Sequence, residues 1–434
     1  MKKTIFALIA VAAMATACEV EDKYYGKEVV DPAEKLEPAY AENWTDHADQ
    51  LDEKLIENFM NKARGTFYST DGDRAGSSWN CYWPQAHAMD VLIDAYLRIP
   101  EGDARREEYR NYMALWYQNK GNNYETGSYS GSYGFGNPYT DDSEWIILTL
   151  IRMYEATGVQ NYLDAAAATY KETVISRWTD DENGGGIRWC MTSENSKNAC
   201  SNGPGALCAM RLWANTEDGP EREQYLADAV KVYNWLSATL YNPETGAVSD
   251  HMINGAITGG PLTYNQGTFL GAAYELYKAT GDTKYMVEAA RAARYTMNSM
   301  ATDGVLNNEG TGDNALFKGI FIRYAMNVWR DAEIDKVDAT LRKEIEDFIY
   351  THPKVSDVQV IGVPDKKYGE EAMACIILKE PGSVTVEEML DYIKASMARH
   401  KVPKYIDFVD AFPMNAAGKI LKYKMREEAT ERLG

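Results

Sequence analysis

Two neighbouring carboxyl groups, those of Asp141 and Asp142, are the side chains whose types and spacing most directly suggest chemistry. Adjacent Cα atoms lie about 3.8 Å apart, so the two carboxyl groups can approach to about 5 Å. Mutual repulsion at that distance raises the pKa of one group and leaves the other ionised. One dipeptide can then supply a proton donor and a nucleophile, which is the pair that a retaining glycosidase uses.

The same residues also have a purely structural explanation. Asp141 is followed three residues later by Glu144, which fits a capping box at the start of a helix. Capping needs one acid, however, and an internal repeat of the sequence carries Tyr264 and Asn265 at the positions of the pair. A helix start of this kind therefore does not require two acids.

The loop before the acid pair, residues 122–139, consists largely of Tyr, Asn, Ser and Gly. Such a loop offers flat stacking faces and many hydrogen-bonding groups, which is what a sugar requires. The alternative is an ordinary flexible surface loop. Trp189 and Tyr264 are further candidates as stacking platforms, although each could equally be a packing residue. The predicted substrate-binding residues are Asn123, Tyr124, Tyr139, Trp189, Tyr264 and Asn265.

A repeat organises the chain around these residues. The segments that begin at Pro138 and Pro261 share Pro, Thr, Tyr and an Ala-Thr-Gly triplet at one offset of 123 residues. A weaker copy lies between them, so the period is about 60 residues and each unit is a pair of helices. The first helix of a unit, such as 143–156, is apolar around most of its circumference, and Gly158 and Gly281 are predicted to end two of these helices.

The remaining units follow the same pattern. Further first helices are expected near Trp83 and Ala315, second helices near Tyr162 and Tyr285, and a leading helix over Trp44–Phe67. Repeated helical hairpins form either an open solenoid or a closed ring. Loops rich in Gly, Tyr and Asn before each first helix favour a ring whose loops gather at one mouth, which is the (α/α)6 toroid.

Five motifs within residues 43–342 are distinctive: Trp83-Pro-Gln, Asn137-Pro-Tyr-Thr-Asp-Asp-x-Glu-Trp145, Gly184-Gly-Gly-Ile-Arg-Trp189, Thr263-Tyr-Asn-Gln-Gly267 and Phe317-Lys-Gly-Ile-Phe321. In these motifs residues 43–342 resemble glycoside hydrolase family 76, the endo-α-1,6-mannanases. The resemblance implies an (α/α)6 fold, retention of configuration, a mannan or mannooligosaccharide substrate and no cofactor, with Asp141 as nucleophile and Asp142 as acid/base.

Composition narrows the class of protein independently. The 434 residues carry 45 Lys and Arg against 65 Asp and Glu, a formal net charge of −20, which excludes an electrostatic nucleic-acid binder. Aromatic usage is biased, with 30 Tyr and 10 Trp against 10 Phe. Tyr and Trp combine an apolar face with a polar edge and suit wet binding surfaces.

The first 18 residues have the pattern of a bacterial lipoprotein signal peptide. A basic start and a short apolar run precede Cys18, and the run is too short to span a bilayer as a mature helix. The alternative is an ordinary signal peptide with an incidental Cys. We expect lipidation at Cys18, attachment to the bacterial outer membrane with exposure at the cell surface, and a tether over residues 19–42.

Cysteine and histidine usage does not predict a metal site. Five Cys remain after Cys18 without a C-x-x-C pair, and the five His are scattered without an H-E-x-x-H motif. Cys190 and Cys200 could pair in an oxidising compartment, or they could be isolated buried thiols. We therefore expect no protein-held metal, and we expect a monomer.

The last part of the sequence, residues 343–434, predicts a separate small α+β domain. Its strands are expected at 355–363, 371–378 and 405–409, with a turn at Pro364-Asp365, and its helices at 344–350, 386–398 and 421–431. It resembles the C-terminal domain of adenylate-forming acyl-CoA synthetases, in which the lysine matching Lys419 contacts carboxylate and phosphate. The resemblance rests on Ile361-Gly-Val-Pro-Asp-Lys-Lys-Tyr-Gly-Glu370, Val402-Pro-Lys-Tyr405 and Pro413-Met-Asn-Ala-Ala-Gly-Lys-Ile420.

The two parts meet near residues 331–343, where the ring should continue through another helix or two. The favoured interpretation is a gene chimera that truncates the ring at its C-terminal end; a natural fusion is the alternative. Lys419 is then a vestigial adenylation lysine, because no matching phosphate loop occurs upstream. Two other functions stay open: a glycan-binding lipoprotein without catalysis, and a fragment of an acyl-CoA or AMP-dependent ligase.

Overall fold

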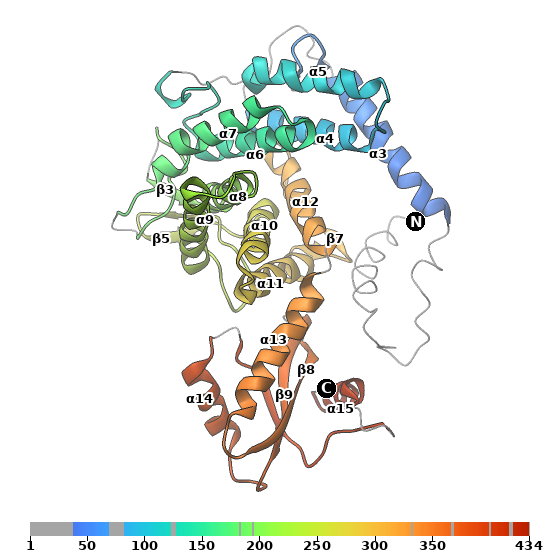
Figure 1. The fold of residues 1–434 in the computed structure, drawn as a ribbon, viewed down its shortest axis with the longest axis vertical. Helices are drawn as coiled ribbons and strands as arrows, with labels where there is room; N and C mark the ends of the chain where they lie inside the picture. The colour runs from blue at the N-terminus through green and yellow to red at the C-terminus, as the bar shows by residue number, and fades with distance from the viewer. Residues whose placement is uncertain are drawn as a thin grey trace.

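The computed structural model describes residues 38–68, 82–122, 127–181, 184–192, 195–330, 333–365, 369–398, 401–415 and 420–433. Most of these residues are helical, and a small sheet lies at the C-terminal end (Figure 1). None of the described helices is both long and apolar enough to span a membrane. The Cys18 anchor, and with it the predicted segments 1–18 and most of 19–42, lie outside the described residues.

The first helix of each repeat belongs to an inner layer, in which neighbours along the chain pack side by side. Their sequences explain this position, because most residues of the three central inner helices are buried on several faces. The inner helices are α4 (Trp83–Arg98), α6 (Thr140–Thr157), α8 (Ala199–Ala214), α10 (Thr263–Thr280) and α12 (Phe317–Arg330).

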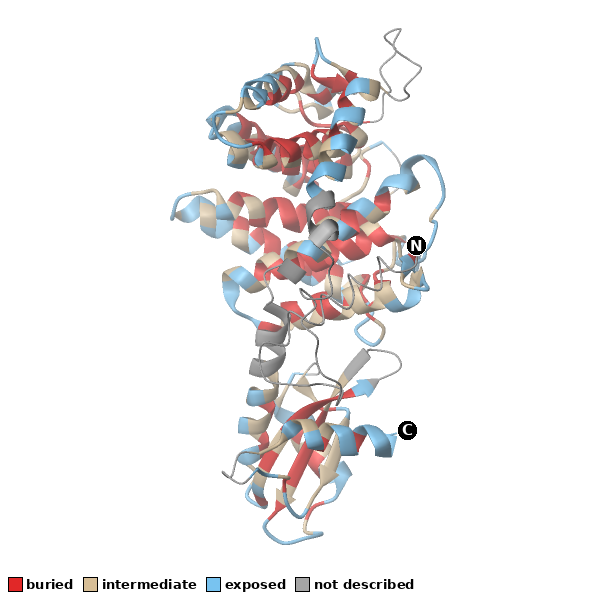
Figure 2. Ribbon diagram, turned by 90° about the vertical axis from the view of Figure 1, so that its right-hand side faces the viewer, coloured by how far each residue is buried: buried red, intermediate tan, exposed pale blue. Residues whose placement is uncertain are grey.

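The second helix of each repeat packs outside its inner partner. The outer helices are α3 (Pro38–Phe59), α5 (Arg105–Gln118), α7 (Gln160–Thr173), α9 (Pro220–Thr239), α11 (Thr283–Ser299) and α13 (Glu333–Tyr350). Figure 2 shows buried residues concentrated between the layers and exposed residues on the outer surface. One apolar cluster runs through these layers from Ile56 to Val328.

The inner layer has five described helices, one fewer than an (α/α)6 toroid contains, and its first and last members, α4 and α12, touch. Arg323 of α12 donates to Asp94 of α4 at 3.0 Å, and the rings of Trp83 and Phe317 at the starts of the same two helices are 6.2 Å apart. Arg152 of α6 also pairs with Asp94. The predicted mainly α toroid, incomplete at its C-terminal end, is confirmed.

The predicted helix stops are confirmed at both glycines. Gly158 after α6 and Gly281 after α10 adopt left-handed conformations, with φ of 72° and 70°. Each donates its backbone N–H to a carbonyl four residues earlier, which is the usual way to end a helix.

The leading helix differs from its prediction of Trp44–Phe67. Helix α3 ends at Phe59, and a hairpin of β1 (Met60–Asn61) and β2 (Thr66–Phe67) follows. Gly65 turns the chain with φ of 68°, and the Gln85 side chain bonds both the N–H and the carbonyl of Phe67. These bonds hold Phe67 in extended backbone, so the helix cannot reach it.

The C-terminal domain is the predicted α+β unit. The sheet order is β10-β9-β8, with β9 antiparallel to β8 and parallel to β10. Helices α13 and α14 pack on one face around Ile345 and Ile393, and α15 packs on the other around Met425. The elements are β8 (Val355–Asp365), β9 (Gly369–Leu378), α14 (Val386–Ser396), β10 (Tyr405–Phe408) and α15 (Lys422–Leu433).

Two predictions for this domain were wrong. Pro364 and Asp365 do not turn but continue β8, pairing with Glu370 and Gly369. Strand β8 is an edge strand, where a residue without an N–H is tolerated. The helix predicted over 344–350 begins at Glu333, because the last outer helix of the ring and the first helix of this domain are one continuous helix, α13.

Candidate active site

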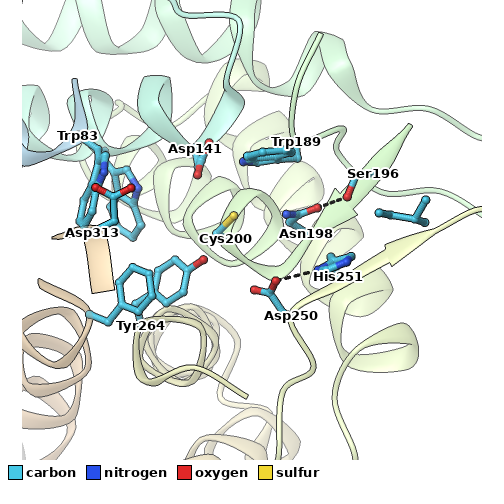
Figure 3. Close-up of a pocket in the computed structure, with 13 residues that line it drawn as sticks. Trp83, Asp141, Trp189, Ser196, Asn198, Cys200, Asp250, His251, Tyr264 and Asp313 are labelled. Atoms are coloured by element: carbon cyan, nitrogen blue, oxygen red, sulfur yellow. Dashed lines mark hydrogen bonds and ion pairs between the residues drawn. The ribbon is translucent and has the colours of Figure 1, made fainter. Parts of the chain in front are cut away.

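A cavity of about 540 Å³ opens at the mouth of the ring, where the inner helices begin (Figure 3). One part of its wall is aromatic and the other part is polar. The aromatic lining residues are Trp83, Trp145, Trp189, Tyr264 and Phe317, and the polar or sulfur-bearing ones are Asp141, Ser196, Asn198, Cys200, Asp250, His251 and Asp313. Among the described residues no Lys or Arg lines the cavity, so this part of its wall suits an uncharged ligand better than an anion.

The turn before α6 is fixed from outside the helix. The Thr140 N–H donates to the Trp189 carbonyl at 2.7 Å, and the Thr140 hydroxyl donates to the Arg188 carbonyl at 2.6 Å. The buried Arg177 guanidinium donates to the Thr140 hydroxyl at 3.0 Å and to the Asn137 carbonyl at 2.8 Å. The acid pair therefore starts its helix on a rigid support.

The capping explanation of the pair was wrong. Helix α6 begins at Thr140, its cap residue is Tyr139, and no side chain caps it. Glu144 is instead fully buried, with no hydrogen-bond partner on either carboxyl oxygen. Burial, and then the nearby Asp141, raise the pKa of Glu144 well above its usual range. Neither Asp141 nor Glu144 is needed to start the helix.

The two aspartates lie in different surroundings. Asp141 lines the cavity, and burial raises its pKa to about 6, against hydrogen bonds from the Cys200 thiol and the Trp189 indole that hold it lower. Asp142 is buried and accepts the backbone N–H of Trp83. Burial, then repulsion from Asp141 and from Asp313, raise the pKa of Asp142 well above its usual range. Asp141 is thus the more readily ionised member of the pair.

The cavity receives some of the predicted substrate-binding residues but not all. Trp189 and Tyr264 line it, and the Tyr264 ring stacks on Phe317 with centroids 3.9 Å apart. Tyr139 instead packs on Trp189 at 5.3 Å and is not a lining residue. Asn265, predicted to bind substrate, is fully buried, donates to Asp250 at 2.8 Å and is not a lining residue. Asn123 and Tyr124 lie outside the described residues.

The wall opposite the acid pair is a small sheet that the sequence did not reveal. It consists of β3 (Ser196–Asn198), β4 (His251–Ile253) and β5 (Ala256–Thr258). Asp250, just before β4, accepts from Asn265, and its other oxygen lies 2.8 Å from the His251 ring. The far nitrogen of His251 lies 2.6 Å from the Thr258 hydroxyl. Asp250 is thereby held with its carboxylate beside the cavity.

Cys200 was missed although a signal for it existed. Asp141, Cys200 and Tyr264 are each the second residue of an inner helix, α6, α8 and α10. The repeat of about 60 residues therefore places all three at one level of the mouth. Cys190 and Cys200 both carry reduced thiols and do not pair.

The described residues contain no group of three or more His, Cys, Asp or Glu that could hold a metal ion. Lys419 lies outside the described residues. Every lining residue of the cavity precedes α13, so no described side chain of the C-terminal domain contributes to it.

Two family models match the chain: glycosyl hydrolase family 76 over residues 43–374 and the AMP-binding enzyme C-terminal domain over residues 344–419. The chain therefore belongs to glycosyl hydrolase family 76 and is a glycoside hydrolase. Its C-terminal part carries the second domain, and the two matches overlap over 344–374.

Solved structures agree with the family 76 assignment. The α-1,6-mannanase GH76A of Salegentibacter sp. HEL1_6 is 32% identical, covers 73% of this chain and 90% of its own, and superposes with a TM-score of 0.57. A family 76 mannosidase from Bacteroides thetaiotaomicron, 20% identical with coverage of 72% and 89% and a TM-score of 0.55, supports the fold alone.

Part of this chain is also similar in sequence to curated acyl-CoA synthetases and ligases. The medium-chain acyl-CoA ligase ACSF2 of Danio rerio is 50% identical over 91 residues, which are 21% of this chain and 15% of that protein. The chain spans between 15% and 26% of the length of the first such relatives.

Proposed function

We propose that this chain is a retaining hydrolase that cuts within the α-1,6-linked backbone of mannan, with Asp141 as nucleophile and Asp142 as acid/base. The observation that carries the proposal is the Asp141–Asp142 pair at the mouth of α6. Asp141 lines the cavity, and its neighbour Asp142 is buried and the harder of the two to ionise.

The first step breaks the glycosidic bond. Asp142 gives its proton to the glycosidic oxygen, which departs with the electron pair of the broken carbon–oxygen bond. A carboxylate oxygen of Asp141 uses its own electron pair to bond to the anomeric carbon, giving a covalent glycosyl ester. In the second step Asp142, now ionised, takes a proton from water. The resulting oxygen attacks the anomeric carbon and releases the Asp141 carboxylate.

The ionisation order of the pair supports these roles. A nucleophile must be ionised and an acid must hold its proton at the same pH. The pKa of Asp141 is raised only to about 6, whereas burial and the Asp141 charge together hold the pKa of Asp142 higher. Between these values the pair carries one proton, and that proton resides on Asp142.

The cavity wall supports a sugar as ligand. Aromatic faces such as that of Trp189 stack on the apolar face of a pyranose, and the Asp250 carboxylate can accept from ring hydroxyls. A solved relative that is 32% identical is an inactive variant of an α-1,6-mannanase, with two consecutive aspartates replaced, in complex with α-1,6-mannotriose. This likeness supports α-1,6-mannan as substrate.

The decisive experiment incubates the full chain with α-1,6-mannan and measures new reducing ends, together with the anomeric configuration of the first product by NMR. We expect oligosaccharides whose first-formed ends retain the α configuration. The Asp142→Asn variant should lose turnover by a factor of about 10² to 10⁴ yet still bind mannooligosaccharide. An inverted first product rules out the covalent intermediate.

Other outcomes of the same assay identify the alternatives. If the wild type binds mannan but produces no new reducing ends, it is a glycan-binding protein. The inner layer of five described helices, one fewer than a complete toroid has, is the reason to test this alternative. Release of pyrophosphate from ATP with a fatty acid, and no hydrolysis of mannan, indicates a ligase.

We also propose that the protein is a monomer anchored by lipid on Cys18 at the outer membrane, with a ring domain over 43–342, and that the domain over 343–434 takes no part in catalysis. Mature protein should incorporate labelled palmitate in bacterial cells, and Cys18→Ala should abolish that label. Labelling of the Cys18→Ala variant contradicts the anchor, and light scattering measures the mass of the soluble form.

A further inference from the structure

The second residues of three consecutive inner helices form a chain of side-chain contacts at the cavity. Figure 3 shows Cys200 of α8 lying between Asp141 of α6 and the hydroxyl end of Tyr264 of α10. A hydrogen bond from the Cys200 thiol acts to lower the pKa of the Asp141 carboxyl, and one from the Tyr264 hydroxyl acts to lower the pKa of the thiol. All three residues line the cavity.

The direction of these bonds follows from the number of protons available. An ionised carboxylate can only accept, so the single thiol proton of Cys200 points toward Asp141. The sulfur is then left as an acceptor, and the Tyr264 hydroxyl supplies the donor. Phe317 fixes the Tyr264 ring by stacking at 3.9 Å, with an angle of 13° between the ring planes. Cys200 itself is only 2% exposed, so its thiol has little freedom to turn elsewhere.

We propose that Cys200 is a positioning residue for the reaction, which holds and orients the Asp141 carboxylate and is itself oriented by Tyr264. The proposal rests on the proposed function, in which Asp141 is the nucleophile. It also gives Tyr264 a second role besides contact with the sugar.

Hydrogen-bond donors around Asp141 would help it to act as a nucleophile. One oxygen must point at the anomeric carbon while the group stays ionised in a largely apolar wall. The Trp189 indole and the Cys200 thiol are the two side-chain donors to Asp141, and they favour the ionised form against burial. Without Cys200 the Trp189 indole is the one side-chain donor left among the described residues, beside the backbone N–H groups of Asp141 and Asp142, and the carboxylate gains both rotational freedom and a higher affinity for a proton.

Several charged and titratable groups on the elements packed around Asp141 also affect the acid pair, and the test must leave these groups unchanged. Asp142 and Glu144 share its helix, Arg177 lies behind it, and Asp250 lies across the cavity. Cys190 and Asp313 act on Asp142, and Cys200 and Tyr264 complete the set. None of these other groups is altered by a substitution at Cys200.

The first test needs no mannanase activity. The full chain and its Asp141→Asn variant are treated with iodoacetamide at pH 8.5, and alkylation of each cysteine is followed by peptide mass mapping. Because the Asp141 charge opposes ionisation of the Cys200 thiol, its removal should speed alkylation of Cys200 by at least about threefold. Cys208, two turns deeper on α8 and bonded to the Glu144 carbonyl, should not change. An unchanged Cys200 rate overturns the contact, and so does an equal rise at Cys208, which would indicate general opening.

The second test uses the pH dependence of mannan hydrolysis. In Cys200→Ala the acid limb of kcat/KM should move upward by about 0.5 to 1 pH unit, with kcat lowered several-fold and KM nearly unchanged. Cys200→Ser restores a donor and should return the limb toward its wild-type position. Tyr264→Phe should shift it in the same direction as Cys200→Ala but less far.

Cys208→Ala is the matched control, since it removes another buried thiol of the same helix without touching Asp141. It should leave the acid limb in place. A limb that stays fixed in Cys200→Ala, or that moves equally in Cys208→Ala, overturns the positioning role. If the wild type does not hydrolyse mannan, the proposed function fails, and the alkylation rates alone decide whether Cys200 contacts Asp141.

Discussion

The mouths of helices α6 and α10 have nearly the same backbone and different chemistry. Both helices start at a Thr, Thr140 or Thr263, after an extended residue without a side-chain cap. Both end at a left-handed glycine after 18 residues. The second and third residues are Asp141 and Asp142 in one and Tyr and Asn in the other.

This difference separates what the fold needs from what the site needs. In α10 the polar side chain Asn265 is satisfied by Asp250, with an amide hydrogen bond of 2.8 Å. In α6 burial raises the pKa of both acids, so their ionised forms are disfavoured by the folded state. A helix start that tolerates neutral residues in one repeat gains nothing in stability from two such acids in another. The acids of α6 are therefore best explained by chemistry.

The largest expected effect comes from removing an acid from the α6 mouth. Asp141→Asn should lower kcat on mannan by at least about 10³-fold, because an amide cannot form the glycosyl ester. A polar change at the α10 mouth, Asn265→Ala, should raise KM and lower kcat by less than about tenfold, because it removes only the hydrogen bond that orients Asp250. Steady-state kinetics on both variants measures the contrast.

Equal losses of kcat in the two variants would contradict this assignment of roles. Circular dichroism and thermal melts of each variant guard against a loss caused by unfolding. Restoration of Asp141→Asn by added azide, with formation of a glycosyl azide, would strengthen the assignment further.

The pH profile is the next sharpest test of the difference. Asp141 must be ionised, and its pKa is raised to about 6, so kcat/KM should fall as the pH drops through about 6. Asp142 must be protonated, and its pKa is raised further by burial and by Asp141, so activity should also fall at a pH above that limb. The profile should be bell-shaped with its optimum above pH 6. An acid limb near pH 4 would show that Asp141 is not held in this environment.

A smaller effect is expected on stability from Glu144, which lies behind the α6 mouth. Its folded-state pKa lies well above the ordinary 4.5, so the stability present below 4.5 is lost as the pH rises toward the folded value. Glu144→Gln cannot ionise and should be more stable than the wild type at pH 8 but not at pH 4. A gain of about 1 kcal/mol corresponds to about 2–4 °C in Tm. The exposed ion-pair residue Glu155 provides the control, since Glu155→Gln should show no such gain at pH 8.

The repeat made the ring largely predictable from the sequence. Ala-Thr-Gly triplets fixed the ends at Gly158 and Gly281, and apolar periodicity located the inner helices to within a few residues. The end of α3 was missed because it depends on the Gln85 side chain, which is 18 residues away from Phe67. Pro364 was misread because its edge position in the sheet depends on the order of strands, which local sequence does not encode.

Site residues that belong to a motif within one segment could be predicted from the sequence. Site residues that are brought together by the pairing of distant segments could not. Asp141 and Trp189 were found from motifs in single segments. Asp250 and His251 were missed because they become a wall only through pairing of β3, β4 and β5. Asn265 was predicted to bind substrate together with Tyr264, yet successive helical residues point about 100° apart, and of these two only Tyr264 lines the cavity.

Substitutions at the C-terminal ends of α6 and α10 should have similar effects on stability, unlike substitutions at their N-terminal ends. Gly158→Ala and Gly281→Ala each place a Cβ in open space but at a left-handed φ, so each should lower the free energy of unfolding by about 1 kcal/mol. Chemical denaturation should give the two variants the same loss within about 0.5 kcal/mol. A much larger loss at Gly158 would mean that the two repeats differ in their backbone as well as in their chemistry.

The smallest effect on mannan hydrolysis is expected from a substitution of Lys419. In the resembling domain of acyl-CoA synthetases the matching lysine acts on a carboxylate and a phosphate, whereas the described residues that line the cavity of this ring include no Lys or Arg and none beyond Phe317. The C-terminal domain has apolar clusters of its own, and Ile345 and Ile349 of α13 pack there rather than against the ring. Lys419→Ala should therefore leave kcat and KM on mannan unchanged, and deletion of residues 351–434 should alter solubility or stability but not kcat per folded molecule. A drop in mannan hydrolysis by folded Lys419→Ala would show that the second domain acts on the ring, and the site would then have to be redrawn to include it.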